Sequence, residues 1–174
     1  MRASKAPALF LAALAAAAAG QSPASGQCRL CAKPTTTVTQ STDGDGIDLE
    51  IATDLDFDRL VPGGNGQAAA VIRPDGSTAA EGNLLRVSPR AMVGTARVHG
   101  TPERTIRVEL PRRIELYSIG GGQISVDEVV SDLPSLPRLD SGGNLTFRFG
   151  GRVRISGDAD GDYRGDMPIT VEYQ

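Results

Sequence analysis

The chain has 174 residues and a mass of 18.1 kDa, which suits one globular domain once a leader is set aside. Its 21 glycines and 11 prolines predict many turns, and therefore short strands rather than long helices. With no Trp, one His and a formal net charge of −3, the chain lacks the basic surface that nucleic-acid binding requires.

Residues 1–26 have the pattern of a cleaved secretory signal peptide. A basic start is followed by an apolar run over residues 8–19, which is shorter than the about 20 residues that span a bilayer. Ala24 and Gly26 supply small side chains for cleavage before Gln27, and a cut several residues earlier is also compatible. We therefore expect an exported product in the periplasm, at the cell surface or outside the cell, without a membrane span in the mature chain.

Cys28 and Cys31 lie directly after the predicted cleavage site. Export places them in an oxidising compartment, so a local disulfide between them is the expected state. A thioredoxin-type redox pair would precede a helix, whereas Pro34 and a run of Thr follow here. One Cys-x-x-Cys pair is also a weak signal for a metal site, because His99 is the only imidazole in the sequence. A redox role, a metal site and attachment to another molecule remain open alternatives.

Residues 27–46 are mostly polar and predict a flexible, Cys-containing tail, with a weak edge strand as the alternative after Pro34. The domain is expected to begin at Ile47, where apolar and acidic residues start to alternate. The Pro74–Ser77 turn predicts a hairpin. The predicted strands cover residues 47–51, 55–57, 67–73, 84–87, 93–99, 105–110, 114–119, 123–130, 145–149, 152–156 and 168–173.

Short strands without helical periodicity predict an all-β fold, namely an antiparallel immunoglobulin-like or pilin-like β-sandwich of about 8–10 strands over residues 47–174. Arg148 and Arg154 alternate with apolar neighbours, so we expect them to face water and to pair with acidic residues. Ser131–Asp140 contains two prolines and predicts a crossover loop. The apolar rows that should set the register are Leu145, Phe147, Phe149, Val153, Ile155, Ile169, Val171 and Tyr173.

The closing segment GGRVRISGDADGDYRGDMPITVEYQ combines a Gly-rich entry, a short strand, a Gly-x-Tyr-x-Gly turn and a final alternating strand. Together with LDFDRLVPG, VIRPDGS and the stretch from VHG to RVELP, it resembles the exported bacterial family called domain of unknown function 4402 (DUF4402), over about Ile47 to Gln174. The resemblance implies a secreted, pilin-like or adhesin-like β-sandwich. It further implies that Gly161, Tyr163 and Gly165 lie at the last hairpin and that Phe57 lies in the core. The Cys-x-x-Cys tail and the Arg-rich strands depart from that pattern and leave a specialised role open.

Subunits of chaperone-assembled fibres offer a looser analogy, because they end in an alternating strand with an aromatic residue one before the end, as Tyr173 stands here. Such subunits donate an N-terminal strand to a neighbour. The Thr-rich residues 35–40 offer little apolar surface for that role, so we favour a complete monomeric sandwich. Other exported subunits or a periplasmic chaperone are the expected partners.

Asp158, Asp160 and Asp162 have a spacing that can place carboxylates around Ca²⁺. An EF-type loop needs Gly at its sixth position and Glu at its twelfth, where this chain has Tyr163 and Ile169. A hairpin turn is therefore the simpler interpretation, because Asp and Gly accept unusual backbone angles.

Enzyme signatures are missing from the sequence. It has no Gly-x-Ser-x-Gly elbow, and His99 lies inside a predicted strand, so we assign no catalytic residue and no cofactor. We expect a non-enzymatic exported structural or interaction module, such as a fimbrial or adhesin-like surface subunit. The alternative is a periplasmic metal-binding or redox-responsive protein that uses Cys28 and Cys31.

Overall fold

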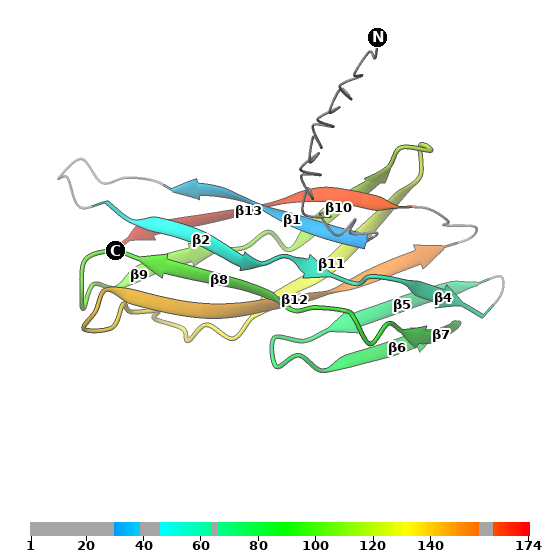
Figure 1. Cartoon of the computed structure of the whole chain (residues 1–174), viewed down its shortest axis with the longest axis horizontal. Helices are drawn as coiled ribbons and strands as arrows, with labels where there is room; N and C mark the ends of the chain where they lie inside the picture. The colour runs from blue at the N-terminus through cyan, green and yellow to red at the C-terminus, as the bar shows by residue number, and fades with distance from the viewer. Residues whose placement is uncertain (1–29, 39–45, 64–65, 157–161) are drawn as a thin grey trace, which may run out of the picture.

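The computed structural model describes residues 30–38, 46–63, 66–156 and 162–174. All the regular secondary structure in these ranges is β-strand. The predicted all-β class is therefore confirmed, and no helix in these ranges is long and apolar enough to cross a membrane. The predicted signal peptide lies outside the described residues. The thirteen described strands (Figure 1) are β1 (Leu30–Val38), β2 (Asp48–Thr53), β3 (Leu55–Asp56), β4 (Leu60–Pro62), β5 (Gln67–Ile72), β6 (Thr78–Gly82), β7 (Leu84–Val87), β8 (Gly94–His99), β9 (Ile106–Glu109), β10 (Arg113–Ser118), β11 (Gln123–Ser131), β12 (Asn144–Ser156) and β13 (Tyr163–Tyr173).

Eleven of these strands form one sheet, and β4 and β7 form a separate pair. The path through the large sheet is β2-β8-β12-β11-β10-β13-β1-β3, while β5 pairs with β12 and β6, and β9 pairs with β13. On one edge, β12 pairs first with β8 and then, from Gly151 onward, with β5; its other edge pairs with β11. The segments 145–149 and 152–156, predicted as two strands, are therefore one continuous strand.

The two ends of this path are neighbours in the chain, because only Asp54 separates β2 from β3. β2 pairs with β8, and Asp56 in β3 extends the same ladder by pairing with Met92, just before β8 begins. On its other edge β3 pairs with β1 at two positions. The sheet therefore curls round until it is nearly a barrel, and β1 is the strand that closes it alongside β13 (Figure 1).

β1 differs from the sequence-based expectation in two ways. It pairs with β13 in parallel over nine positions, whereas an antiparallel fold was expected. It also lies within residues 27–46, for which a flexible tail or, after Pro34, a weak edge strand was expected, and its Leu30, Cys31 and Ala32 are buried. The polar composition of this segment was a poor guide because the edge of β13 offers backbone hydrogen bonds to any extended chain, whatever its side chains.

The core follows the predicted alternation. Six members of the apolar rows in β12 and β13 are buried, and Leu145 and Tyr173 are partly buried against them. Phe57, just after β3, is also buried. Each large side chain contributes about 1.5–3 kcal/mol when buried, and a shift of one residue would turn a whole row toward water. The buried members of the rows are Phe147, Phe149, Val153, Ile155, Ile169 and Val171.

The predicted hairpin at Pro74–Ser77 is confirmed, because β5 and β6 pair in antiparallel fashion around it. Gly76 has a φ of 86°, a conformation that favours glycine, and its N–H donates to the carbonyl of Arg73 at 2.8 Å. The Asp75 carboxylate accepts a hydrogen bond from the N–H of Ser77 at 2.8 Å, and hydrogen bonds from Ser77 lower the pKa of Asp75. This turn brings β5 and β6 to the second half of β12, where the candidate site lies.

Candidate functional site

The candidate site is a pocket on the outer face of five adjacent strands, β6, β5, β12, β11 and β10. It is partly open to solvent and has a volume of about 530 Å³. We call it the arginine pocket because arginines dominate its charged lining. The lining side chains that carry polar groups are Gln67, Glu81, Arg113, Glu115, Gln123, Ser125, Arg152 and Arg154.

Strand periodicity explains why the arginines of β12 face outward. The residues on either side of Arg154 are buried in the core, so Arg152 and Arg154 project from the opposite face. Arg154 has Ala69 of β5 and Ser125 of β11 as its register partners, and both line the pocket. Their small side chains leave space between the longer side chains of the neighbouring rows, and this space is the pocket.

Each of the three arginines is paired with two carboxylates. The side chains involved are between 20% and 62% exposed, so each pair contributes only about 0–1 kcal/mol to stability. The network therefore orients side chains more than it stabilises the fold. The nitrogen–oxygen distances are 2.6 Å for Arg113–Glu115, 3.4 Å for Arg113–Asp127, 3.2 Å for Arg152–Glu81, 3.3 Å for Arg152–Glu128, 2.9 Å for Arg154–Asp127 and 3.7 Å for Arg154–Glu128.

Two side chains set the hydrogen-bonding character of the pocket. The amide of Gln123 donates to Glu115 Oε2 at 3.1 Å, and this bond, followed by those from Arg113, lowers the pKa of Glu115. The Glu115 carboxylate is therefore an acceptor at neutral pH. The Nε of Arg152 is buried and has no hydrogen-bond partner. Because an unsatisfied buried donor costs about 1–3 kcal/mol, this nitrogen would gain a partner if a ligand moved the side chains that cover it.

The prediction that Arg148 and Arg154 face water and pair with acidic neighbours is confirmed. Arg148 lies on the first half of β12, outside the pocket, with its Nε 3.2 Å from Asp132 Oδ2. Arg154 lies in the pocket and pairs as described above. Arg148 and Arg154 follow the same alternation on β12 but have different neighbours, because β8 borders the first half of the strand and β5 borders the second half.

Two of the side chains that the sequence suggested for metal or redox chemistry are described by the structure, and neither lines the pocket. Asp162 is exposed just before β13, and Cys31 is buried in β1. Within the described ranges, no three His, Cys, Asp or Glu side chains are placed to hold a metal ion. The disulfide and the Ca²⁺ loop remain predictions, because three of their residues lie outside the described ranges: Cys28, Asp158 and Asp160. Gly161 of the neighbouring predicted turn also lies outside them.

Two residues that the resemblance placed in the last hairpin are strand residues of β13. Tyr163 is its first residue and is buried, and a Cβ added at Gly122 would overlap its hydroxyl. Gly165 lies inside the strand, where a Cβ would overlap the backbone carbonyl of Glu115. Both positions therefore serve the close packing of β13 against β10 and the turn that follows it.

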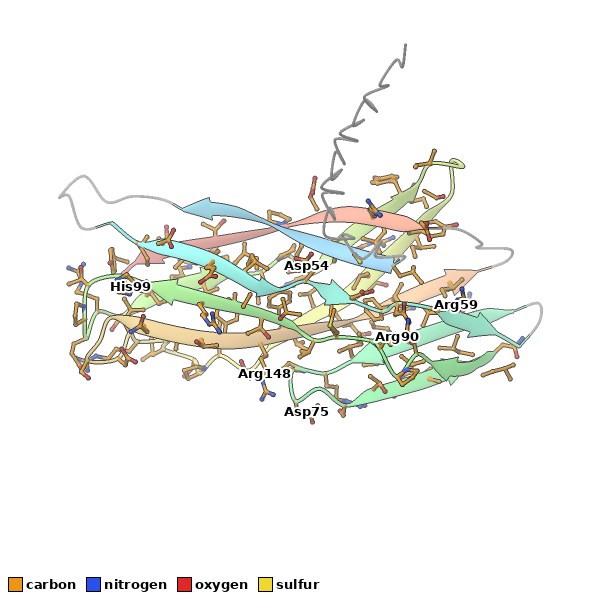
Figure 2. All side chains as sticks on the ribbon, viewed as in Figure 1. Asp54, Arg59, Asp75, Arg90, His99 and Arg148 are labelled. Atoms are coloured by element: carbon orange, nitrogen blue, oxygen red, sulfur yellow. The ribbon has the colours of Figure 1, made fainter. Side chains whose placement is uncertain are left out.

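His99 is the last residue of β8, which confirms the prediction that it lies in a strand. Its Nδ1 lies 3.0 Å from Oδ1 of Asn144, and both side chains are exposed. Figure 2 shows His99 at one end of the sheet, well apart from Asp54 and Arg90. Its surroundings therefore resemble those of a surface strand residue.

The sequence reasoning missed the arginine pocket. Glu81, Arg113 and Arg152 come from three distant segments, and only the pairing of β6, β5, β12, β11 and β10 places them on one face. The available signal was the shared alternation of RVRIS and RIELY, in which charged residues occupy the first and third positions and apolar residues the second and fourth. That pattern predicts a charged face on each strand but not which faces adjoin.

A family model described as Domain of unknown function (DUF4402) matches residues 47–173. The chain belongs to the DUF4402 family. The resemblance found in the sequence is thus confirmed, and the matched part of this DUF4402 protein includes every strand that lines the arginine pocket while leaving out β1. No curated protein and no solved structure matches the chain.

Proposed function

We propose that this DUF4402 protein is an exported, non-enzymatic structural and interaction module, a fimbrial or adhesin-like surface subunit of β-sandwich type. The signal-peptide pattern of residues 1–26 supports export. The observation that carries the proposal is the place of β1, which lies outside the matched domain and between β13 and β3.

β1 is bound to the rest of the sheet through the backbone along its whole length. It has nine register partners in β13 and two in β3. Backbone pairing of this kind is available to a strand from the same chain or from a second copy, because the edges of β13 and β3 are identical in both. The Thr-rich composition of residues 35–40 favoured a complete monomer, but backbone pairing does not depend on apolar side chains. We therefore expect copies to assemble by exchange of β1, so that the strand of one copy completes the sheet of the next.

The test mixes two differently tagged forms of the mature chain at high concentration and measures captured partners and molar mass in solution. Exchange predicts mixed oligomers. The matched control carries Thr37→Cys and Thr170→Cys, whose positions are register partners, so that a disulfide locks β1 to its own chain. The locked form should stay monomeric and resume exchange after reduction. If the mature chain without the added cysteines forms no mixed oligomers at any concentration tested, the subunit proposal is wrong.

A further inference from the structure

Every arginine of the arginine pocket is already paired with carboxylates. Three arginines and two glutamates line the pocket, and Asp127 and Glu128 pair with these arginines from outside the lining. The whole network of three guanidinium groups and four carboxylates, at nitrogen–oxygen distances from 2.6 to 3.7 Å, has a formal net charge of −1. An anionic ligand would bind beside four carboxylates, in a network of net negative charge. A cationic ligand would meet three guanidinium groups. A neutral ligand needs to break none of these ion pairs.

The pocket keeps hydrogen-bonding capacity after the ion pairs are counted. A carboxylate has about four acceptor sites and a guanidinium has five N–H donors, so one or two contacts leave others open. The Nε of Arg152 is an additional unpaired donor, which becomes available only if the side chains that cover it move. Gln123 and Ser125 add an amide and a hydroxyl to the lining. Donors and acceptors placed side by side match hydroxyl groups, because each hydroxyl both donates and accepts.

These groups are oriented before a ligand arrives, which lowers the entropy cost of binding. Glu115 is held at both oxygens, by Arg113 at 2.6 Å and by Gln123 at 3.1 Å. Tyr117 follows two residues later on the same face of β10, is the register partner of Gln123, and is 59% exposed. An exposed tyrosine offers a flat apolar ring beside a polar hydroxyl. The polar pocket therefore has an aromatic platform at its margin.

We propose that the arginine pocket binds a neutral, hydroxyl-rich ligand, namely a short oligosaccharide. Its volume of about 530 Å³ falls within the ~300–1,000 Å³ of small-molecule sites. Five strands at a spacing of ~4.8 Å span roughly 19 Å, which accommodates linked sugar rings. Arg152 and Arg154 donate to ring hydroxyls, Glu115 accepts from them, and Tyr117 packs against one ring. The site is independent of β1, so it stands whether or not copies exchange that strand.

The test titrates the mature protein with maltotriose, cellotriose, mannotriose and tri-N-acetylchitotriose, using calorimetry and the NMR signals of arginine side chains. Trigalacturonate and inorganic phosphate serve as anionic probes. We expect saturable binding of at least one neutral trisaccharide, with a shift of the Arg152 Nε–H signal. Failure of every neutral probe to saturate, or preferential binding of either anion, overturns the proposal.

Arg154→Gln and Arg97→Gln form a matched pair of variants. Both arginines are exposed, at 55% and 60%, and each pairs with a carboxylate, but Arg97 lies on β8 outside the pocket. Loss of one charged donor should weaken trisaccharide binding by about tenfold in Arg154→Gln, and binding to Arg97→Gln should be unchanged. Tyr117→Ala should also weaken binding while leaving the ion pairs intact. Equal losses in the two arginine variants, with both folded by circular dichroism, contradict the proposal.

Discussion

The hydroxyl of Tyr173 accepts a hydrogen bond from the backbone N–H of Thr101, with 2.7 Å between oxygen and nitrogen, although 72 positions separate the two residues. The same hydroxyl lies 3.3 Å from the carbonyl oxygen of Gly46, to which it donates. The guanidinium carbon of Arg104 lies 4.8 Å from the centre of the Tyr173 ring. One side chain near the end of β13 therefore joins the entry to β2 and the loop after β8.

Tyr173→Phe should destabilise the protein by about 1–2 kcal/mol, because it leaves the Thr101 N–H without its acceptor inside a partly buried site. The free energy of unfolding is measured by urea denaturation. Tyr117→Phe is the matched control, since that ring is 59% exposed, and its stability should be unchanged. Similar losses in the two variants would show that the hydroxyl bond is not what stabilises this corner.

Gly94→Ala should destabilise the protein by about 1–3 kcal/mol through overpacking. Gly94 and Phe149 are register partners on β8 and β12, and an added Cβ would overlap the aromatic ring of Phe149. Thermal unfolding measures the effect. Gly46→Ala is the control, because a Cβ there meets nothing within 4 Å. An unchanged melting temperature for Gly94→Ala would mean that the ring moves aside without cost.

Asp56→Asn should make stability less dependent on pH. Burial raises the pKa of the Asp56 carboxyl, and repulsion from Asp58 and Asp54 adds to this, although a hydrogen bond from the Asp58 N–H acts in the opposite direction. Ionisation is therefore less favourable in the folded than in the unfolded chain, so this group's contribution to stability falls as the pH rises from about 3.8 through the raised folded value.

The asparagine removes the charge and keeps an oxygen to accept from the Asp58 N–H, a bond of 2.7 Å. We expect the variant to have the higher urea midpoint at about pH 7 and to lose this advantage at about pH 3, where the carboxyl is protonated in both states. A variant that is less stable than the parent at neutral pH would contradict this reading of Asp56.

The cysteine pair is tested by intact mass spectrometry of the purified mature protein, with an alkylating reagent before and after reduction. We expect no alkylation before reduction, a disulfide between Cys28 and Cys31, and no retained metal. Cys31 is only 4% exposed, which disfavours ready thiol exchange. Retained metal, or reduction of the pair under mild conditions, would favour the metal-binding or redox alternative.

The rows of β12 and β13 show how far the sequence can be read. Their alternation predicted which side chains are buried because a strand's two faces are determined by local geometry. The Pro74–Ser77 turn was equally predictable, since its residues suit the backbone angles that the turn requires. The break expected between Phe149 and Arg152 did not occur, because Gly150 and Gly151 are buried within β12, between β5 and β11.

The sequence alone determined the all-β class, the buried rows and the family, each of which depends on residues close together in the chain. Only the tertiary structure decided that β1 lies parallel to β13, that Asp56 extends the ladder of β2, and that Arg113 and Arg152 share one pocket. The physical reason is that backbone hydrogen bonds between strand edges are nearly independent of side-chain identity. Which edges meet is therefore settled by the folded chain as a whole.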